Sequence, residues 1–257
     1  MELAELASRL TCTTSLVPDP REGDCVPAAL SSARANAARA RKDVELPRCQ
    51  DYIELLEGYL HNQPAQPLPR TLKWSSAFTG GTVKCHCLEH DLLLFIARVA
   101  GCLRDGGAEA AKSGPCEEAV SLLRRASGVA DALVVRAEEV SDAMESARPR
   151  PAECAPAYAR MLSRLCLAEA QALAAARAEG KGVSDALCAS LHIGAAQLFE
   201  EAGNALRDNL GCFDAISQRV WDVLHCGRKA CAAAAFAAHA RHLLSDAGGV
   251  RVGAALA

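Results

Sequence analysis

The sequence predicts a mostly α-helical protein that carries one small β-hairpin near residues 72–87. Alanine and leucine dominate a composition that is 51% hydrophobic but only 4% aromatic, and such a composition favours packed helices over sheets. From residue 88 onward, helical segments follow one another and are separated by glycine and proline. At 257 residues the chain is long enough to bury a substantial core.

The N-terminal part is expected to contain two helices and a turn. Residues 28–42 are strong helix formers, and Pro47 is expected to end that segment. Residues 63–70 are rich in proline and are expected to form a turn. Between residues 51 and 60, apolar side chains recur at the spacing of one helical face, namely Tyr52, Leu55, Leu56 and Tyr59.

The hairpin is predicted from two short runs on either side of Gly80 and Gly81. A glycine pair between two such runs is typical of a tight β-turn. Residues 72–87 give the only convincing strand signal in the sequence.

Five longer helices are expected after the hairpin. Glycine or proline stands at each expected break, including Gly106-Gly107, and Gly248-Gly249 follows the last helix. Long helices joined by short loops build bundles or helical-pair solenoids, and no fixed repeat period singles out one repeat class. The expected helices cover residues 88–105, 116–146, 156–179, 184–209 and 213–246.

Charge and hydropathy exclude several classes of function. The 28 basic and 31 acidic residues give a net charge of -3 without a long basic block, so no nucleic-acid partner is expected. The longest apolar run, Ala230 to Ala238, has about nine residues, which is short of the roughly 20 needed to span a bilayer. Glu2 stands where myristoylation would need glycine, and neither a secretory signal nor a prenylation cysteine is evident. Membrane contact is therefore expected to be peripheral, through a partner.

The chain contains 13 cysteines, an odd number. Without a secretory signal, we expect reduced thiols that pack as small hydrophobic side chains in a cytoplasmic protein. Typical single positions within predicted helices are Cys102, Cys166, Cys188 and Cys231.

The sharpest chemical cluster is formed by Cys85, Cys87 and His90, because thiolate and imidazole are good zinc ligands. No second Cys/His pair at a finger-like distance completes a four-ligand site. His239 and His242 lie three residues apart but lack the intervening glutamate of a zinc-protease helix. Nucleophile-elbow, phosphate-loop and dinucleotide motifs are absent. We expect a protein that is not an enzyme and holds no metal or cofactor, with zinc binding at Cys85, Cys87 and His90 as an alternative.

Several blocks, taken in order, resemble the Bro-one (BRO) domain family of the Alix, Rhophilin and Brox type. The most specific block is Leu167-Ala168-Glu169-Ala170-Gln171, which is close to the family's Leu-Ala-Gln-Ala-Gln. Together the blocks cover most of residues 51 to 256. The other matching blocks are Asp51–Leu60, Leu72-Lys73-Trp74, Leu88–Ala97, Glu118–Gly128 and Trp221–His239.

The resemblance implies a curved helical domain with a core of tetratricopeptide-like helical pairs and a small sheet on one side. Residues 46–257 would form the BRO-like domain, continuous with a poorly matched N-terminal region over residues 1–45. The family's domain continues with further helices beyond the position of Gly253, so a diverged and C-terminally shortened relative is expected.

The resemblance also implies a partner and a site. Family members bind the C-terminal amphipathic helix of an ESCRT-III (Snf7/CHMP4-type) subunit in an apolar surface patch. The patch positions fall on Ala174, Leu187 and Leu191, and the two leucines share a helical face at i, i+4. Ala174 replaces the family's phenylalanine, and losing an aromatic anchor costs roughly 2 kcal/mol or more at an interface.

The function expected from the resemblance is a non-catalytic adaptor in endosomal sorting, cytoplasmic and peripherally associated with endosomes. The alternative is a helical scaffold of the same fold that uses a different protein partner.

Overall fold

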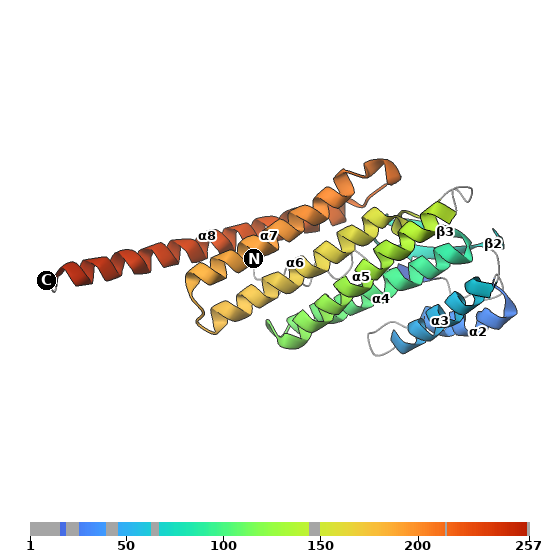
Figure 1. Ribbon diagram of the computed structural model, residues 1–257, viewed down its shortest axis with the longest axis horizontal. Helices are drawn as coiled ribbons and strands as arrows, with labels where there is room; N and C mark the ends of the chain where they lie inside the picture. Colours follow the sequence, from blue (N-terminus) through green and yellow to red (C-terminus); the bar gives the residue numbers. More distant parts are fainter. Residues whose placement is uncertain are drawn as a thin grey trace.

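The helices form a side-by-side array in a computed structural model of the chain, and the mostly helical fold class is confirmed (Figure 1). The structure describes residues 16–18, 26–39, 46–62, 67–143, 150–213 and 215–255. Two short 3-10 helices, η3 (Ala152–Cys154) and η4 (Leu210–Cys212), lie between longer elements. The α-helices are α2 (Ala28–Arg39), α3 (Leu46–Asn62), α4 (Leu88–Ala111), α5 (Glu117–Ala143), α6 (Pro156–Gly180), α7 (Asp185–Arg207) and α8 (Gln218–Ala255).

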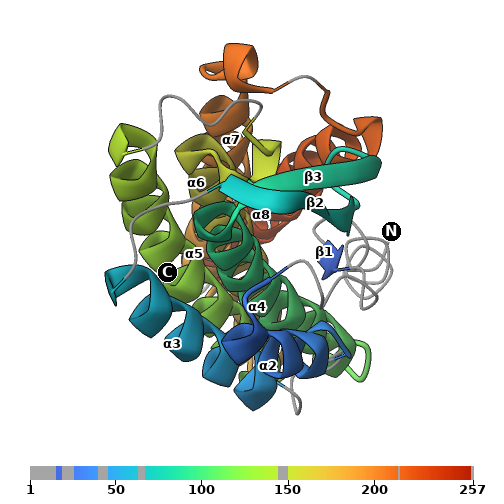
Figure 2. The ribbon, with the colours of Figure 1, turned by 90° about the vertical axis from the view of Figure 1, so that its right-hand side faces the viewer.

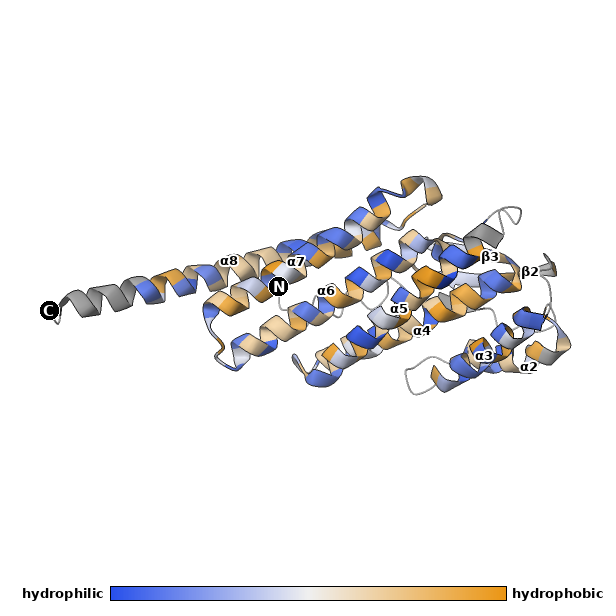
Figure 3. Ribbon diagram, in the orientation of Figure 1, coloured by the Kyte–Doolittle hydropathy of each residue, from blue (hydrophilic) through white to orange (hydrophobic). Residues whose placement is uncertain are grey.

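Each of the helices α4 to α7 packs against the next helix along the chain, so that α8 packs on α7. Helices α2 and α3 pack against each other, and α3 packs on α4. Helix α8 extends beyond α6 and α7 at one end of the array, and the sheet lies at the other end (Figures 1 and 2). Where Figure 3 colours the helices, hydrophobic and hydrophilic residues alternate along them, as expected for helices that bury one side and expose the other.

The predicted hairpin is formed by β2 (Pro67–Ser76) and β3 (Gly81–Cys87), which pair in an antiparallel register. Its turn contains Gly80 at a φ of +74°, a conformation that favours glycine. Trp74 lies opposite Val83, and both side chains are buried. The hairpin therefore contributes to the core.

Two features of the sheet were not predicted. Strand β2 begins at Pro67, inside the segment that was expected to be a turn. A further strand, β1 (Leu16–Pro18), pairs antiparallel with β2 and gives the order β1-β2-β3. Three residues show too little alternation of polarity to be recognised as a strand.

Two expectations for the N-terminal helices are wrong. Pro47 does not end a helix but lies in the first turn of α3, where its missing N–H has no acceptor within the helix. Leu55 is 52% exposed, whereas Tyr52 and Leu56 are fully buried. The buried stripe of α3 runs instead through Cys49, Tyr52 and Leu56. Residues 40–42, 63–66 and 144–146, for which helix or turn was expected, lie outside the described residues.

The expected break at Gly106-Gly107 is also wrong, because α4 continues to Ala111. A Cβ atom at Gly107 would lie 2.9 Å from Leu123 Cγ and 3.1 Å from the Ala119 carbonyl oxygen of α5. Gly107 therefore allows α4 and α5 to approach closely and does not end the helix. Helix α8 likewise continues past Gly248-Gly249.

A buried polar network joins the N-terminal helices and the hairpin to α4. Asp91 of α4 accepts hydrogen bonds from Arg34 of α2, Tyr52 of α3 and Trp74 of β2. All four side chains are at most 1% exposed. One carboxylate thus fixes the positions of three other elements.

Candidate protein-binding surface

Helix α6 is held against α4 by a buried ion pair. Glu169, which is 8% exposed, accepts hydrogen bonds from Arg104 Nε at 2.8 Å and from Arg104 Nη2 at 2.5 Å. Buried carboxylates are stable only when they are paired. Arg104 therefore explains why glutamate stands at this position of the Leu-Ala-Glu-Ala-Gln block.

The same block positions α6 against α7. Gln171 Nε2 donates a hydrogen bond to the Leu191 carbonyl oxygen at 3.4 Å and would lie 3.5 Å from a Cβ atom at Gly194. The two helices are antiparallel neighbours, so the next turn of α6 lies beside the preceding turn of α7. From this register we infer that Ala174, one turn after Gln171, lies near Leu187 and Leu191, the residues predicted from the sequence.

These residues belong to a strip of partly exposed apolar side chains. Leu187 is 51% exposed, and the others are half-buried. On α7 the leucines follow one another at i, i+4 and i+11, which keeps them on one face of the helix. We call this surface the α6–α7 strip, and its members are Leu167, Ala174, Leu187, Leu191 and Leu198.

Ion pairs border the strip. At one end, Arg164 of α6 contacts Glu201 of α7 at 3.3 Å. On the side of α5, Arg177 of α6 contacts Glu117 at 3.0 Å. An apolar centre with a charged, solvent-exposed border is the usual composition of a protein-binding surface.

Helix α8 braces the start of α7, close to Leu187. Arg241 Nε lies 2.9 Å from Asp185 Oδ1, and Arg241 Nη2 lies 2.9 Å from Glu179 Oε1. Beneath these contacts, Ala238 of α8 packs against Cys188 of α7 in a small apolar cluster. The brace fixes the first turn of α7, so the position of Leu187 does not depend on the α6–α7 loop alone.

The alternative zinc site is placed in the core. Cys85, Cys87 and His90 are all at most 2% exposed, and the Cys85 thiol donates to the Cys87 carbonyl oxygen. Burial raises the pKa of Cys87 to about 12 and lowers the pKa of His90 to about 4. Among the residues that the structure describes, no three His, Cys, Asp or Glu side chains are grouped to hold a metal ion. The cluster therefore does not form a ligand set.

The cysteines within helices behave as predicted from the sequence. Cys166, Cys188 and Cys231 are buried free thiols, and Cys102 is half-buried. Burial raises the pKa of Cys231 to about 11, which keeps this thiol protonated at neutral pH. None of the described helices is both long and apolar enough to cross a membrane.

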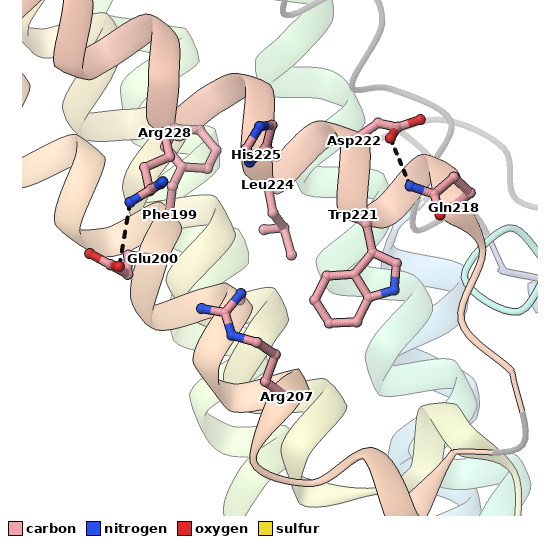
Figure 4. Close-up of a pocket in the computed structure, with 10 residues that line it drawn as sticks. Phe199, Glu200, Arg207, Gln218, Trp221, Asp222, Leu224, His225 and Arg228 are labelled. Atoms are coloured by element: carbon pink, nitrogen blue, oxygen red, sulfur yellow. Dashed lines mark hydrogen bonds and ion pairs between the residues drawn. The ribbon is translucent and has the colours of Figure 1, made fainter.

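The sequence did not predict the pocket between α7 and α8. Arg207 of α7 lies beside the Trp221 ring of α8, and the Phe199 ring of α7 lies close to Arg228 (Figure 4). In the sequence, Trp221 stands out only as the start of a block that resembles the family. The pocket depends on how the two helices are placed relative to each other. The separate sequence patterns of the two helices do not contain this information.

Comparisons with known proteins agree with this fold. The profile of the BRO1-like domain family matches residues 21–257. Among curated proteins no match is found. Several solved structures are similar to this chain. Three of them are described below, and at their low sequence identity the likeness shows a shared fold.

The first of these neighbours is the ALIX BRO1 CHMP4C complex, with a TM-score of 0.66 and 18% identity over 87% of this chain and 70% of that chain. The second is ALIX in complex with the SIVmac239 PYKEVTEDL late domain, with a TM-score of 0.65 and 21% identity over 87% of this chain and 36% of that chain. The third is a Bro1 domain structure that concerns endosomal targeting by that domain. It has a TM-score of 0.66 and 14% identity over 91% of this chain and 71% of that chain.

Proposed function

Because the chain belongs to the BRO1-like domain family, we propose that it is a non-catalytic adaptor that binds an amphipathic helix on the α6–α7 strip. The partner we propose is the C-terminal helix of an ESCRT-III (Snf7/CHMP4-type) subunit. In this role the protein acts in the cytoplasm and associates peripherally with endosomes through that partner.

The observation that carries this proposal is the exposure of Leu187 beside the half-buried Leu191 and Ala174. When a partner covers a leucine that is half exposed next to other apolar side chains, the removal of its apolar surface from water stabilises the complex. The leucines of α7 extend over residues 187–198, which corresponds to about 16 Å or three helical turns. A partner helix with apolar residues at i, i+3, i+4 and i+7 has a matching length.

The neighbouring complex supports the choice of partner, because it joins the ALIX BRO1 domain to CHMP4C. The shared fold supports a scaffold in preference to an enzyme. Composition supports it as well, since the sequence offers no nucleophile, phosphate-loop or dinucleotide motif.

Binding of a labelled peptide tests the proposal. The purified chain is titrated into a fluorescent peptide that copies the C-terminal helix of the Snf7-type subunit from the same organism. We expect saturable binding in the micromolar range. In the double variant Leu187→Asp/Leu191→Asp, we expect a loss of at least about tenfold, because two carboxylates would be buried unpaired under the peptide.

Ile193→Asp is the matched control. Ile193 is 50% exposed on the same helix but lies two residues from Leu191, on a different face. Its substitution should leave binding unchanged. Equal binding by the double variant, or no binding by a folded sample, would contradict the proposal.

Ala174 favours a second candidate function, a scaffold of the same fold with a different protein partner. An alanine leaves the strip shallow at the position where the family carries phenylalanine. Absence of peptide binding, together with capture of a different helical partner that Leu187→Asp/Leu191→Asp abolishes, would support this second function.

A further inference from the structure

A pocket of about 340 Å³ lies between α7 and the first turns of α8, away from the α6–α7 strip (Figure 4). Along α7 the pocket begins at Phe199, directly after Leu198 of the strip, but it is formed with α8, whereas the strip is formed with α6. A volume of this size is at the lower end of the range for ligand pockets and accommodates one large side chain with its neighbours. The pocket is lined by Phe199, Glu200, Gly203, Arg207, Gln218, Trp221, Asp222, Leu224, His225 and Arg228.

The inner wall of the pocket is apolar and firmly positioned. Phe199 is 1% exposed and Leu224 is 4% exposed, while the half-buried Trp221 points its indole ring into the pocket (Figure 4). A Cβ atom at Gly227 would lie 2.5 Å from two atoms of the Phe199 ring. Gly227 therefore lets α8 pack directly on that ring, which fixes one aromatic face of the pocket.

The charges around the pocket are unequally neutralised. Glu200 forms an ion pair with Arg228 at 3.5 Å, and Asp222 accepts a hydrogen bond from Gln218 at 2.9 Å. Glu200 is therefore paired with a cation, whereas Asp222 is held by a neutral amide.

The Asp222 carboxylate, whose partner is a neutral amide, points away from Arg207 on the other side of Trp221 (Figure 4). Arg207 is the cation of the pocket that is not paired with a carboxylate of the pocket. Its Nη2 donates to the neutral amide oxygen of Asn204, and within the described part of the chain no carboxylate forms an ion pair with it. The guanidinium lies over Gly203, where a Cβ atom would approach Nη1 to 3.2 Å. Gly203 thus allows this cation to lie along α7 at the mouth of the pocket, in the space before Trp221 (Figure 4).

We propose that this pocket is a second peptide-binding site, which takes a large apolar side chain followed or preceded by a carboxylate. The apolar side chain, aromatic by preference, contacts the partly exposed Trp221 ring, which the buried Phe199 and Leu224 support from behind, since aromatic pairs gain from edge and face contacts. The adjacent Asp or Glu of the same peptide binds Arg207 in a charge-assisted hydrogen bond. A free inorganic anion would satisfy Arg207 but would leave the accessible part of the Trp221 ring uncovered, so the chemistry favours a peptide.

Tryptophan fluorescence of the full chain tests the proposal. Of the two tryptophans, Trp74 is 1% exposed in the core, so a change upon titration reports on Trp221. The probe is the capped pentapeptide Gly-Asp-Phe-Asp-Gly. We expect saturable binding with a dissociation constant on the order of 0.1–1 mM, the range for one buried side chain with one ion pair.

Arg207→Gln should weaken this binding at least about fivefold, and Arg219→Gln should not, because Arg219 is exposed on α8 outside the pocket. The matched peptides Gly-Asn-Phe-Asn-Gly and Gly-Asp-Ala-Asp-Gly should both bind at least about fivefold more weakly. Circular dichroism shows whether each variant remains folded.

Equal affinity for the Asp and Asn peptides, or full affinity in Arg207→Gln, would overturn the proposal. So would an equal signal from sodium phosphate at the same concentration, which would indicate a simple anion site. The variant Leu187→Asp/Leu191→Asp should bind the pentapeptide normally, so failure at this pocket and failure at the α6–α7 strip are distinguishable.

Discussion

The Arg34 guanidinium binds the Asp91 carboxylate through two hydrogen bonds of 2.9 Å, although the two residues are 57 positions apart in the sequence. Neither side chain is more than 1% exposed. Tyr52 and Trp74 donate to the same carboxylate at 2.8 and 3.0 Å. Each of the two carboxylate oxygens therefore accepts two hydrogen bonds. The packing of α2, α3 and β2 on α4 therefore depends on one buried charge.

Substitution Asp91→Asn should destabilise the chain strongly. It leaves Arg34 buried without a counter-charge, and breaking a buried ion pair in this way typically costs about 3–5 kcal/mol. Urea unfolding followed by circular dichroism measures the loss. Asp51→Asn, at an exposed position of α3, is the control and should change the unfolding free energy by no more than about 0.5 kcal/mol. A similar small effect for both variants would show that the network contributes little.

Asp105 should make the free energy of unfolding depend on pH. Its Oδ1 is buried without a hydrogen-bond partner, and burial raises its pKa from 3.8 to about 7. Between these two values the folded chain holds a proton that the unfolded chain releases, so this group lowers stability as the pH rises from about 4 to about 7.

Substitution Asp105→Asn should remove that loss, because the amide is neutral at every pH. We expect the free energy of unfolding of the variant, relative to that of the natural chain, to increase by about 1–3 kcal/mol as the pH rises from 4 to 8. Unfolding of both proteins at each pH gives the difference, in which the opposite contribution of His90, whose pKa burial lowers to about 4, cancels. A difference that does not change with pH would contradict the prediction.

Gly107→Ala tests the close approach of α4 and α5. Helix propensity alone would favour alanine by about 1 kcal/mol. The added Cβ atom, however, would lie 2.9 Å from Leu123 Cγ, and such overpacking costs about 1–3 kcal/mol. We expect a net loss in thermal unfolding. Gly128→Ala is the matched control, because nothing lies within 4 Å of its Cβ position on α5, and it should stabilise the chain. Stabilisation by both substitutions would show that α5 moves to accommodate the added Cβ atom at Gly107 of α4.

Local patterns predicted the helices well, because each long helix carries its own periodicity and its own composition. The same reasoning failed at Gly107 and Pro47, since both residues also have uses inside a helix. Glycine permits close packing at the first, and proline suits a first turn at the second. Distinguishing these uses from helix breaks requires knowledge of the neighbouring helix.

The candidate site was predictable only in part. The spacing of Leu187 and Leu191 placed them on one face, and the resemblance added Ala174. The sequence could not reveal that Gln171 fixes the register of α6 against α7, or that Arg104 neutralises Glu169 from 65 positions away. Such contacts depend on tertiary structure, and so does the placement of Arg207 beside Trp221.

Substitution Ala174→Phe should strengthen binding of the Snf7-type helix to the α6–α7 strip. Ala174 is half-buried beside Leu187 and Leu191, so a phenylalanine there would add apolar contact area at the middle of the strip. Restoring an aromatic anchor is expected to contribute about 1.4 kcal/mol or more, which corresponds to a tenfold lower dissociation constant. Fluorescence anisotropy with the labelled peptide measures the change. Ala132→Phe, which adds the same ring at an exposed position of α5, should leave the affinity unchanged. An unchanged or weaker affinity in a folded Ala174→Phe variant would indicate that the partner approaches another part of the surface, because an apolar ring at the contact would otherwise be buried favourably.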